Sequence, residues 1–170
     1  KIIPIRDGVA SFSKDIRIPI RPHIGTIGVA TVGPSLSTFY PHDHGGNLDT
    51  KEITKGNAVY LPVSQPGAML ALADIHAIMA DGEVFVTGIE IMGTVKLKAD
   101  LIPGLGLRRP AVETRDAWMA LGSAETLDEA AKIATADDVD LLARGRGMPG
   151  RRPTCSPPSC ATCASARTWT

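Results

Sequence analysis

Residues 68–91 read "AMLALADIHAIMADGEVFVTGIEI" and carry most of the information about the fold. An apolar run at 68–73 and a mostly apolar run at 84–91 flank the acidic sequence DGE at 81–83. Short apolar runs bounded by turn residues are typical of strands buried in a sheet. We therefore expect two strands here, with a tight acidic turn before the second.

Three other segments have the character of strands: 24–32, which glycines interrupt, 58–63, which a proline ends, and 94–101. In the last of these, "TVKLKADL", apolar and charged residues alternate, as in a strand with one exposed face. Glycine and proline residues separate the segments. Many short strands divided by turns predict a mainly β fold of the sandwich or barrel type, and we assign it to residues 1–107.

The pattern changes beyond this region. Residues 117–122, "AWMALG", predict one more strand, and residues 126–143 predict a helix with an approximate apolar stripe. Thr126 is a suitable N-cap, and Glu129 three residues later completes a capping box. We therefore expect a small α+β element over 108–147, near the carboxy terminus.

Residues 148–170 have no periodicity and differ in composition from the rest of the chain. We interpret this tail as aberrant, either disordered or translated out of frame. With allowed codons and one base restored at Gly150, the other frame reads "MPREEAYMLASLMCDLRIGQNVD", an amphipathic helix followed by a strand. On this interpretation the three cysteines and their CxxC spacing carry no zinc or redox chemistry.

Bulk composition excludes several classes of protein. With 44% hydrophobic residues, 21% charged residues and no net charge, the chain can bury a core but lacks the basic surface of a nucleic-acid binder. The sequence contains no apolar run of about 18 residues, so we expect no membrane span. It starts without a signal-peptide pattern or an initiator Met, so we expect a cytoplasmic protein of which this chain is a piece.

The run "PHDHGGNLDT" at 41–50 concentrates polar groups and glycines. His44 can bind a metal or carry protons, and Asp49 can bind a cation or orient a histidine. Gly45 and Gly46 allow close backbone approach, and Asn47 offers a donor and an acceptor that suit an amide. The alternative is a simple turn between strands.

A second polar group follows the apolar run at 68–73. Asp74 and His76 share one face of a strand, since they are two residues apart. Asp81 and Glu83 stand in the acidic turn, where one carboxylate near a metal or another carboxylate can act as a general base. Glu90 lies within an apolar strand and needs a partner or solvent exposure. The alternative is a solvated turn beside a packed histidine.

In order and spacing, "RPHIGTIGVA", "HGGNLDTKEITKGNAVYLPVSQPGAMLALADIHAIMADGEV" and "VTGIEI" resemble the acetamidase/formamidase family. The resemblance covers residues 19–101, continues more weakly through "AWMALGSAETLDEAA", and includes the reframed tail. It implies a mainly β fold with a small α/β element, and hydrolysis of a short aliphatic amide such as formamide or acetamide. The polar positions that match are His44, Gly45, Gly46, Asn47, Asp49, Asp74, His76, Asp81, Glu83 and Glu90.

Some residues depart from the family pattern. His42 stands where the family has other residues, so it is not a family ligand, and Ala80 replaces a glycine before the acidic turn. His23 follows Arg21-Pro22 and is interpreted as a turn residue. The family's amino-terminal part is missing, so we expect a fragment of a catalytic unit.

The scheme we prefer uses a metal-activated water, because no serine elbow or cysteine nucleophile occurs before the tail. The expected roles are as follows: metal ligands His44, Asp49 and His76; acid–base residues Asp81, Glu83 and Asp74; substrate-binding residues Gly45, Gly46 and Asn47. Histidine ligands favour zinc over calcium. We expect a homodimer, and the rival interpretation is an inactive fragment or a non-enzymatic β domain.

Overall fold

The computed structural model describes residues 1–144 and 165–168, which form twelve strands and one helix. The strands are β1 (Ile5–Arg6), β2 (Val9–Ser11), β3 (Arg17–Pro19), β4 (His23–Gly28), β5 (Pro41–His42), β6 (Gly45–Asn47), β7 (Ala58–Tyr60), β8 (Ala71–Ile78), β9 (Ile89–Glu90), β10 (Ala111–Glu113), β11 (Trp118–Ala124) and β12 (Ser165–Thr168). The helix is α1 (Leu127–Arg144). The mainly β prediction is confirmed.

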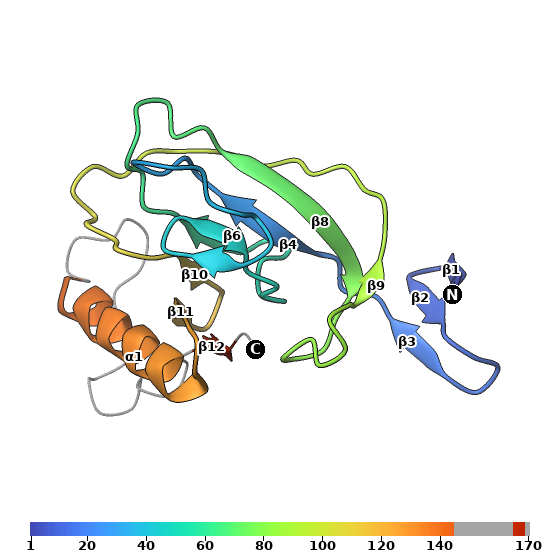
Figure 1. Ribbon diagram of the computed structural model, residues 1–170. Coiled ribbons are helices and arrows are strands. Elements are labelled where there is room, and N and C mark those ends of the chain that lie inside the picture. The colour runs from blue at the N-terminus through green and yellow to red at the C-terminus, as the bar shows by residue number, and fades with distance from the viewer. Residues whose placement is uncertain (145–164, 169–170) are drawn as a thin grey trace.

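A five-stranded antiparallel sheet in the order β5-β6-β4-β8-β9 forms the centre of the molecule (Figure 1). Its longest strand, β8, pairs with β4 on one side and β9 on the other. In β4, alternate residues are buried, so His23, Gly25 and Ile27 share the inner face. The register places His23 opposite His76, and His76 opposite Glu90.

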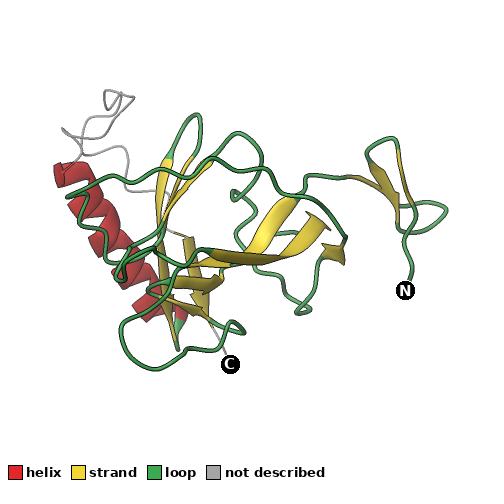
Figure 2. Ribbon diagram, turned by 90° about the horizontal axis from the view of Figure 1, so that it is seen from above, coloured by secondary structure: helices red, strands yellow, loops and turns green. Residues whose placement is uncertain are grey.

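A four-stranded sheet, β12-β11-β10-β7, packs against the first sheet. The main core cluster lies between them and consists of Ile27, Leu48, Ile53, Val112 and Leu121. In this sheet β7 pairs with β10, so it joins the two regions that the sequence separates at residue 107. Strands β1, β2 and β3 form a small sheet of their own, which projects away from the rest (Figures 1 and 2).

Helix α1 covers one side of the four-stranded sheet (Figure 2). As predicted, Thr126 caps it, since the Glu129 amide donates to Thr126 Oγ1 at 3.3 Å. Buried Asp137 accepts hydrogen bonds from Arg108 at 3.1 Å and Arg109 at 2.9 Å, which anchors the helix to the segment before β10. Within the described residues, no helix has the length and apolarity that a membrane crossing requires.

Several strand predictions need correction. Residues 94–101 form no strand, although their residues alternate, and Leu97 and Leu101 are 47% and 68% exposed. The strand expected at 68–73 is displaced to Ala71–Ile78, because Gly67, Ala68 and Met69 all have positive φ and form a turn. Most of 148–170 lies outside the described residues, and 165–168 within it form β12.

Candidate metal and active site

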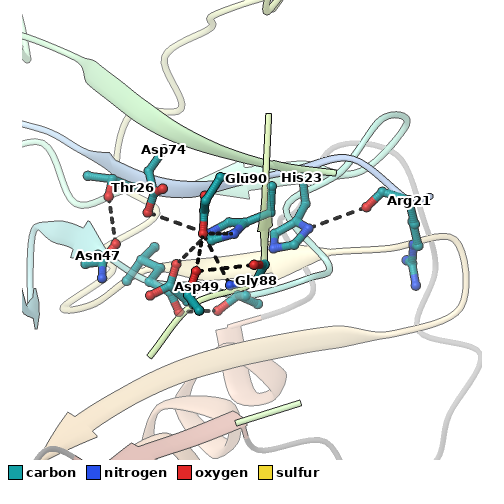
Figure 3. Close-up of polar contacts among 12 residues, drawn as sticks. Arg21, His23, Thr26, Asn47, Asp49, Asp74, Gly88 and Glu90 are labelled. Carbon is teal, nitrogen blue, oxygen red and sulfur yellow. Dashed lines mark hydrogen bonds and ion pairs between the residues drawn. The ribbon is translucent and has the colours of Figure 1, made fainter. Parts of the chain in front are cut away.

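His76 is the centre of a group of titratable side chains on the five-stranded sheet. The residue is only 1% exposed, and both ring nitrogens face carboxylates. Nε2 lies 3.2 Å from Asp49 Oδ1 and 3.5 Å from Asp74 Oδ2, while Nδ1 lies 3.3 Å from Glu90 Oε1. Figure 3 shows the side chains of Asp49, Asp74 and Glu90 pointing toward one another.

Asp49 is held beside His76 by the backbone of β4. The amides of Leu48 and Asp49 both donate to the carbonyl oxygen of Gly25, at 2.9 and 3.0 Å. Asp49 has a positive φ of 39° and is 1% exposed. Its Oδ2 atom is buried and has no hydrogen-bond partner among the described residues. A buried carboxylate oxygen without a donor is costly, so the site is suited to a cation.

Gly25 provides the space between these ligand atoms. It lies opposite Asp74, because the residues on either side of it in β4 pair with Ile75 and Ala73 in β8. A Cβ atom at position 25 would stand 2.6 Å from Asp49 Oδ1, 2.6 Å from Asp74 Oδ2 and 2.8 Å from His76 Nε2. A point that close to two carboxylate oxygens and an imidazole nitrogen is where a cation fits and a methyl group does not.

A second set of ligand atoms lies on the other side of the imidazole. The ligand atoms of His76, Glu83 and Glu90 are all within 4.8 Å of one another, as are those of Asp49, Asp74 and His76. Nδ1 of His76 is buried and is not aligned for a hydrogen bond to Glu90 despite the short distance. Glu90 Oε1 instead accepts hydrogen bonds from Thr87 Oγ1 at 3.0 Å and the Gly88 amide at 3.2 Å.

His23 completes the row across β4, β8 and β9. It is 3% exposed, and its ring stacks on that of His76 at 4.9 Å with an angle of 15° between the planes. Its Nδ1 lies 3.4 Å from the carbonyl oxygen of Arg21 (Figure 3). The interpretation of His23 as a turn residue is wrong, since it is the first residue of β4 and packs on His76.

Other predicted site residues lie outside these two groups. Asp81 is at the surface, with an 82% exposed side chain, and is paired with Lys51 at 2.7 Å. His44 lies in the β5–β6 turn and stacks on His42 at 5.7 Å. Asn47 Oδ1 accepts a hydrogen bond from Thr26 Oγ1 at 2.7 Å (Figure 3).

Gly45 and Gly46 have a packing reason for lacking side chains. Their φ angles are 108° and 106°, and both residues are buried in β6. A Cβ at position 45 would collide with the carbonyl oxygen of Ile27, and one at position 46 would stand 2.5 Å from that of Tyr40. The strand can therefore pack here only with glycine at both positions.

Burial shifts the pKa values of two side chains in this region, Asp74 and His44. Partial burial raises the pKa of Asp74, His76 opposes that rise, and the charges of Asp49 and Glu90 add to it. Burial lowers the pKa of His44, with a further contribution from His42, while Asp43 opposes both. The raised pKa of Asp74 and the lowered pKa of His44 both favour the neutral form of the side chain, and perturbed pKa values of this kind are common at functional sites.

The sequence profile of the acetamidase/formamidase family matches residues 28–120. The chain belongs to this family. It is 36% identical over 104 residues to an acetamidase of Mycolicibacterium smegmatis, covering 56% of this chain and 25% of that protein. It is 44% identical over 66 residues to a formamidase of Methylophilus methylotrophus, covering 38% and 16% of the two chains. The family prediction is confirmed.

Solved structures of the family share this fold. A predicted acetamidase/formamidase from Thermoanaerobacter tengcongensis superposes with a TM-score of 0.82 at 44% identity, covering 85% of this chain and 48% of that one. An acetamidase from Yersinia enterocolitica gives 0.83 at 34% identity, covering 87% and 45%. The chain described here thus matches about half the length of the two solved structures. It matches a quarter or less of the length of the acetamidase and the formamidase.

Proposed function

We propose that this family member hydrolyses short aliphatic amides, such as formamide and acetamide, to a carboxylate and ammonia. Relatives of the chain are named acetamidase and formamidase, which supports this substrate class. The observation that carries the proposal is the set of three ligand atoms from Asp49, Asp74 and His76 around Gly25. This arrangement is suited to a hydrolytic site that uses a divalent cation.

The ligands we propose for the cation are Asp49, Asp74 and His76. His44 was expected to be a ligand, but the group around Gly25 contains Asp74 in its place. One imidazole nitrogen with two carboxylates suits zinc, and a carboxylate-rich site also admits calcium. When bound, the cation supplies Lewis acidity, which activates water and stabilises negative charge on oxygen.

The remaining roles fall to the protein's own groups. Water adds to the carbonyl carbon, the C–N bond breaks, and the departing nitrogen takes up a proton. We assign the proton transfers to Glu83 in the second group, because Asp74, which was expected to be an acid–base residue, is a ligand of the cation in this proposal. Since Thr26 occupies Asn47 Oδ1, Asn47 offers its N–H groups to the substrate carbonyl oxygen.

We further propose that residues 1–107 form the region that carries the site and that residues 108–147 support it. Arg109 links the two, because it contacts Asp137 in α1 and lies 2.8 Å from Asp43 beside the histidine turn. Gly45 and Gly46 would contribute backbone groups at the edge of the site, and His44 a neutral imidazole.

The test is an ammonia-release assay on the protein with formamide and acetamide, together with elemental analysis of bound metal. Asp49→Asn keeps the size of the side chain and should lower both metal content and turnover at least about 100-fold. Asp100→Asn, at an exposed position in the 94–101 segment, is the matched control and should change neither. Full activity without a bound divalent ion, and after treatment with a chelator, would contradict the metal proposal. Absence of ammonia release from metal-loaded protein would contradict the proposed function and favour a non-enzymatic β domain.

A further inference from the structure

We infer that Lys51 and Asp81 are positioning residues, which hold the turn at 81–86 against the Asp49 loop so that Glu83 reaches the second ligand group. The inference rests on the proposed function, and it assigns Asp81 a different role from that of a general base. Asp81 would act through its ion pair with Lys51, and Glu83 would carry the protons.

The first observation is the position of the pair in the chain. Lys51 follows the buried ligand Asp49 by two residues, and Asp81 precedes Glu83 by two. Lys51 Nζ lies 2.7 Å from both carboxylate oxygens of Asp81, so a single ammonium group contacts both oxygens. The lysine side chain is only 32% exposed, which fixes its stem against the protein. The pair therefore connects the loop that carries Asp49 to the turn that carries Glu83.

The second observation is that the apolar side chains of the turn do little to hold it in place. The turn joins β8 to β9 and extends beyond the end of the sheet (Figure 1). The side chains of Val84, Phe85 and Val86 are 81%, 90% and 80% exposed, so their burial contributes almost nothing. Glu83 and Val86 also have positive φ angles of 42° and 60°, a conformation that costs non-glycine residues free energy. A strained, exposed turn needs an attachment, and the ion pair supplies one.

The magnitude of the effect separates the two possible roles of Asp81. An exposed ion pair is worth about 0.2–1 kcal/mol, which corresponds to a change of at most about fivefold in the population of the attached turn. Removal of a general base lowers the rate by about 100- to 10,000-fold. If Asp81 positions the turn, Asp81→Asn should lower kcat/KM only about two- to fivefold, and Lys51→Met should lower it equally.

The experiment compares Asp81→Asn, Lys51→Met and the exchanged pair Lys51→Asp with Asp81→Lys. The exchange restores an ion pair across the same gap, so we expect kcat/KM to recover to within about twofold of the parent. A general base at position 81 would not be replaced by lysine in this way. Lys98→Met is the matched control, because Lys98 forms an exposed pair with Asp100 far along the chain from the site, and it should have no effect.

Amide hydrogen exchange of residues 82–86, followed by mass spectrometry, measures the attachment without any need for activity. Exchange should rise about two- to fivefold in both single variants and return in the exchanged pair. A loss of activity above about 100-fold in Asp81→Asn, or unchanged exchange in Lys51→Met, would overturn the inference. If the parent releases no ammonia but the exchange pattern is as expected, the proposed function fails and the attachment stands.

Discussion

At the scale of the residue, Gly25 is the position where one added methyl group should oppose the cation binding that we propose. We expect Gly25→Ala to lower the affinity for zinc at least about tenfold, since its Cβ would lie within 2.6–2.8 Å of three ligand atoms. Isothermal titration calorimetry measures the affinity. Gly93→Ala is the control, because a Cβ there would meet only the side chain of Ile75, with Cδ1 at 3.2 Å and Cγ2 at 3.7 Å, and it should bind zinc normally. Unchanged affinity in Gly25→Ala would place the cation elsewhere.

A second residue, Asp138, has a direct effect on stability. Burial raises its pKa to about 6, with a smaller contribution from Asp137, although the Ala120 amide donates to it at 2.8 Å and opposes the rise. Because the folded pKa lies above the unfolded value, the folded state holds more protons in this range. The stabilising contribution of Asp138 is therefore complete below about pH 4 and is lost as the pH rises through about 6.

Asp138→Asn should consequently stabilise the protein at pH 7. Because the residue is partly exposed, we expect a gain of no more than about 1 kcal/mol, which disappears near pH 4. Urea unfolding of both proteins at the two pH values measures the difference. Asp140→Asn removes an ion pair with Arg108 and should not stabilise. A variant that is less stable than the parent at pH 7 would show that the Ala120 hydrogen bond outweighs the burial of charge.

The residues of the site were predictable from sequence to the extent that their side chains are titratable. Asp49 and His76 were expected to be metal ligands and Asp74 an acid–base residue, and the structure brings these three together, while the expected ligand His44 lies outside the group. His23 and Gly25 were missed. The signal was present in β4, where a period of two places both on the buried face with Ile27, but a glycine shows no chemistry until its neighbours are known.

At the scale of the element, the contact between α1 and β11 depends on Gly122. A Cβ there would collide with the Ala130 carbonyl oxygen and stand 2.8 Å from the Ala134 amide nitrogen, so Gly122→Ala must push the helix away from the sheet. We expect a loss of about 1–3 kcal/mol in the free energy of unfolding. Ser123→Ala, one residue along the same strand, is the control and should cost less than about 0.5 kcal/mol. Chemical denaturation measures both, and equal values would contradict the close contact.

Elements were predicted best where a local signal determines them. Helix α1 has its cap in the sequence, and the structure begins it at Leu127, directly after Thr126. The segment 94–101 alternates well and yet forms no strand. A strand requires a neighbour that pairs with its backbone, and alternation along one segment says nothing about that neighbour.

At the scale of the whole molecule, several large apolar side chains lie on the surface. Besides the turn at 84–86, Met92 is 96% exposed, Val32 73% and Phe39 69%. Exposed apolar side chains favour association when they meet in one patch, and the homodimer stays a prediction. We predict that Phe85→Ser, which removes a 90% exposed aromatic ring, reduces concentration-dependent association in sedimentation velocity experiments. Lys98→Ser should leave the association unchanged, and an equal effect of both would exclude the turn as a contact.

The pairing of β7 with β10 has a practical consequence for protein engineering. Between Glu90 and Ala111 the chain runs without contributing a strand to any sheet, and yet the segments on either side of it share the four-stranded sheet and its core. A break in this connection should leave two polypeptides that recognise each other, since β10 and β11 would still add to the edge presented by β7. If two separately expressed halves reassemble on mixing, a break between Glu90 and Ala111 would give a split protein. Its amide-hydrolysing activity would then appear only when the two halves meet.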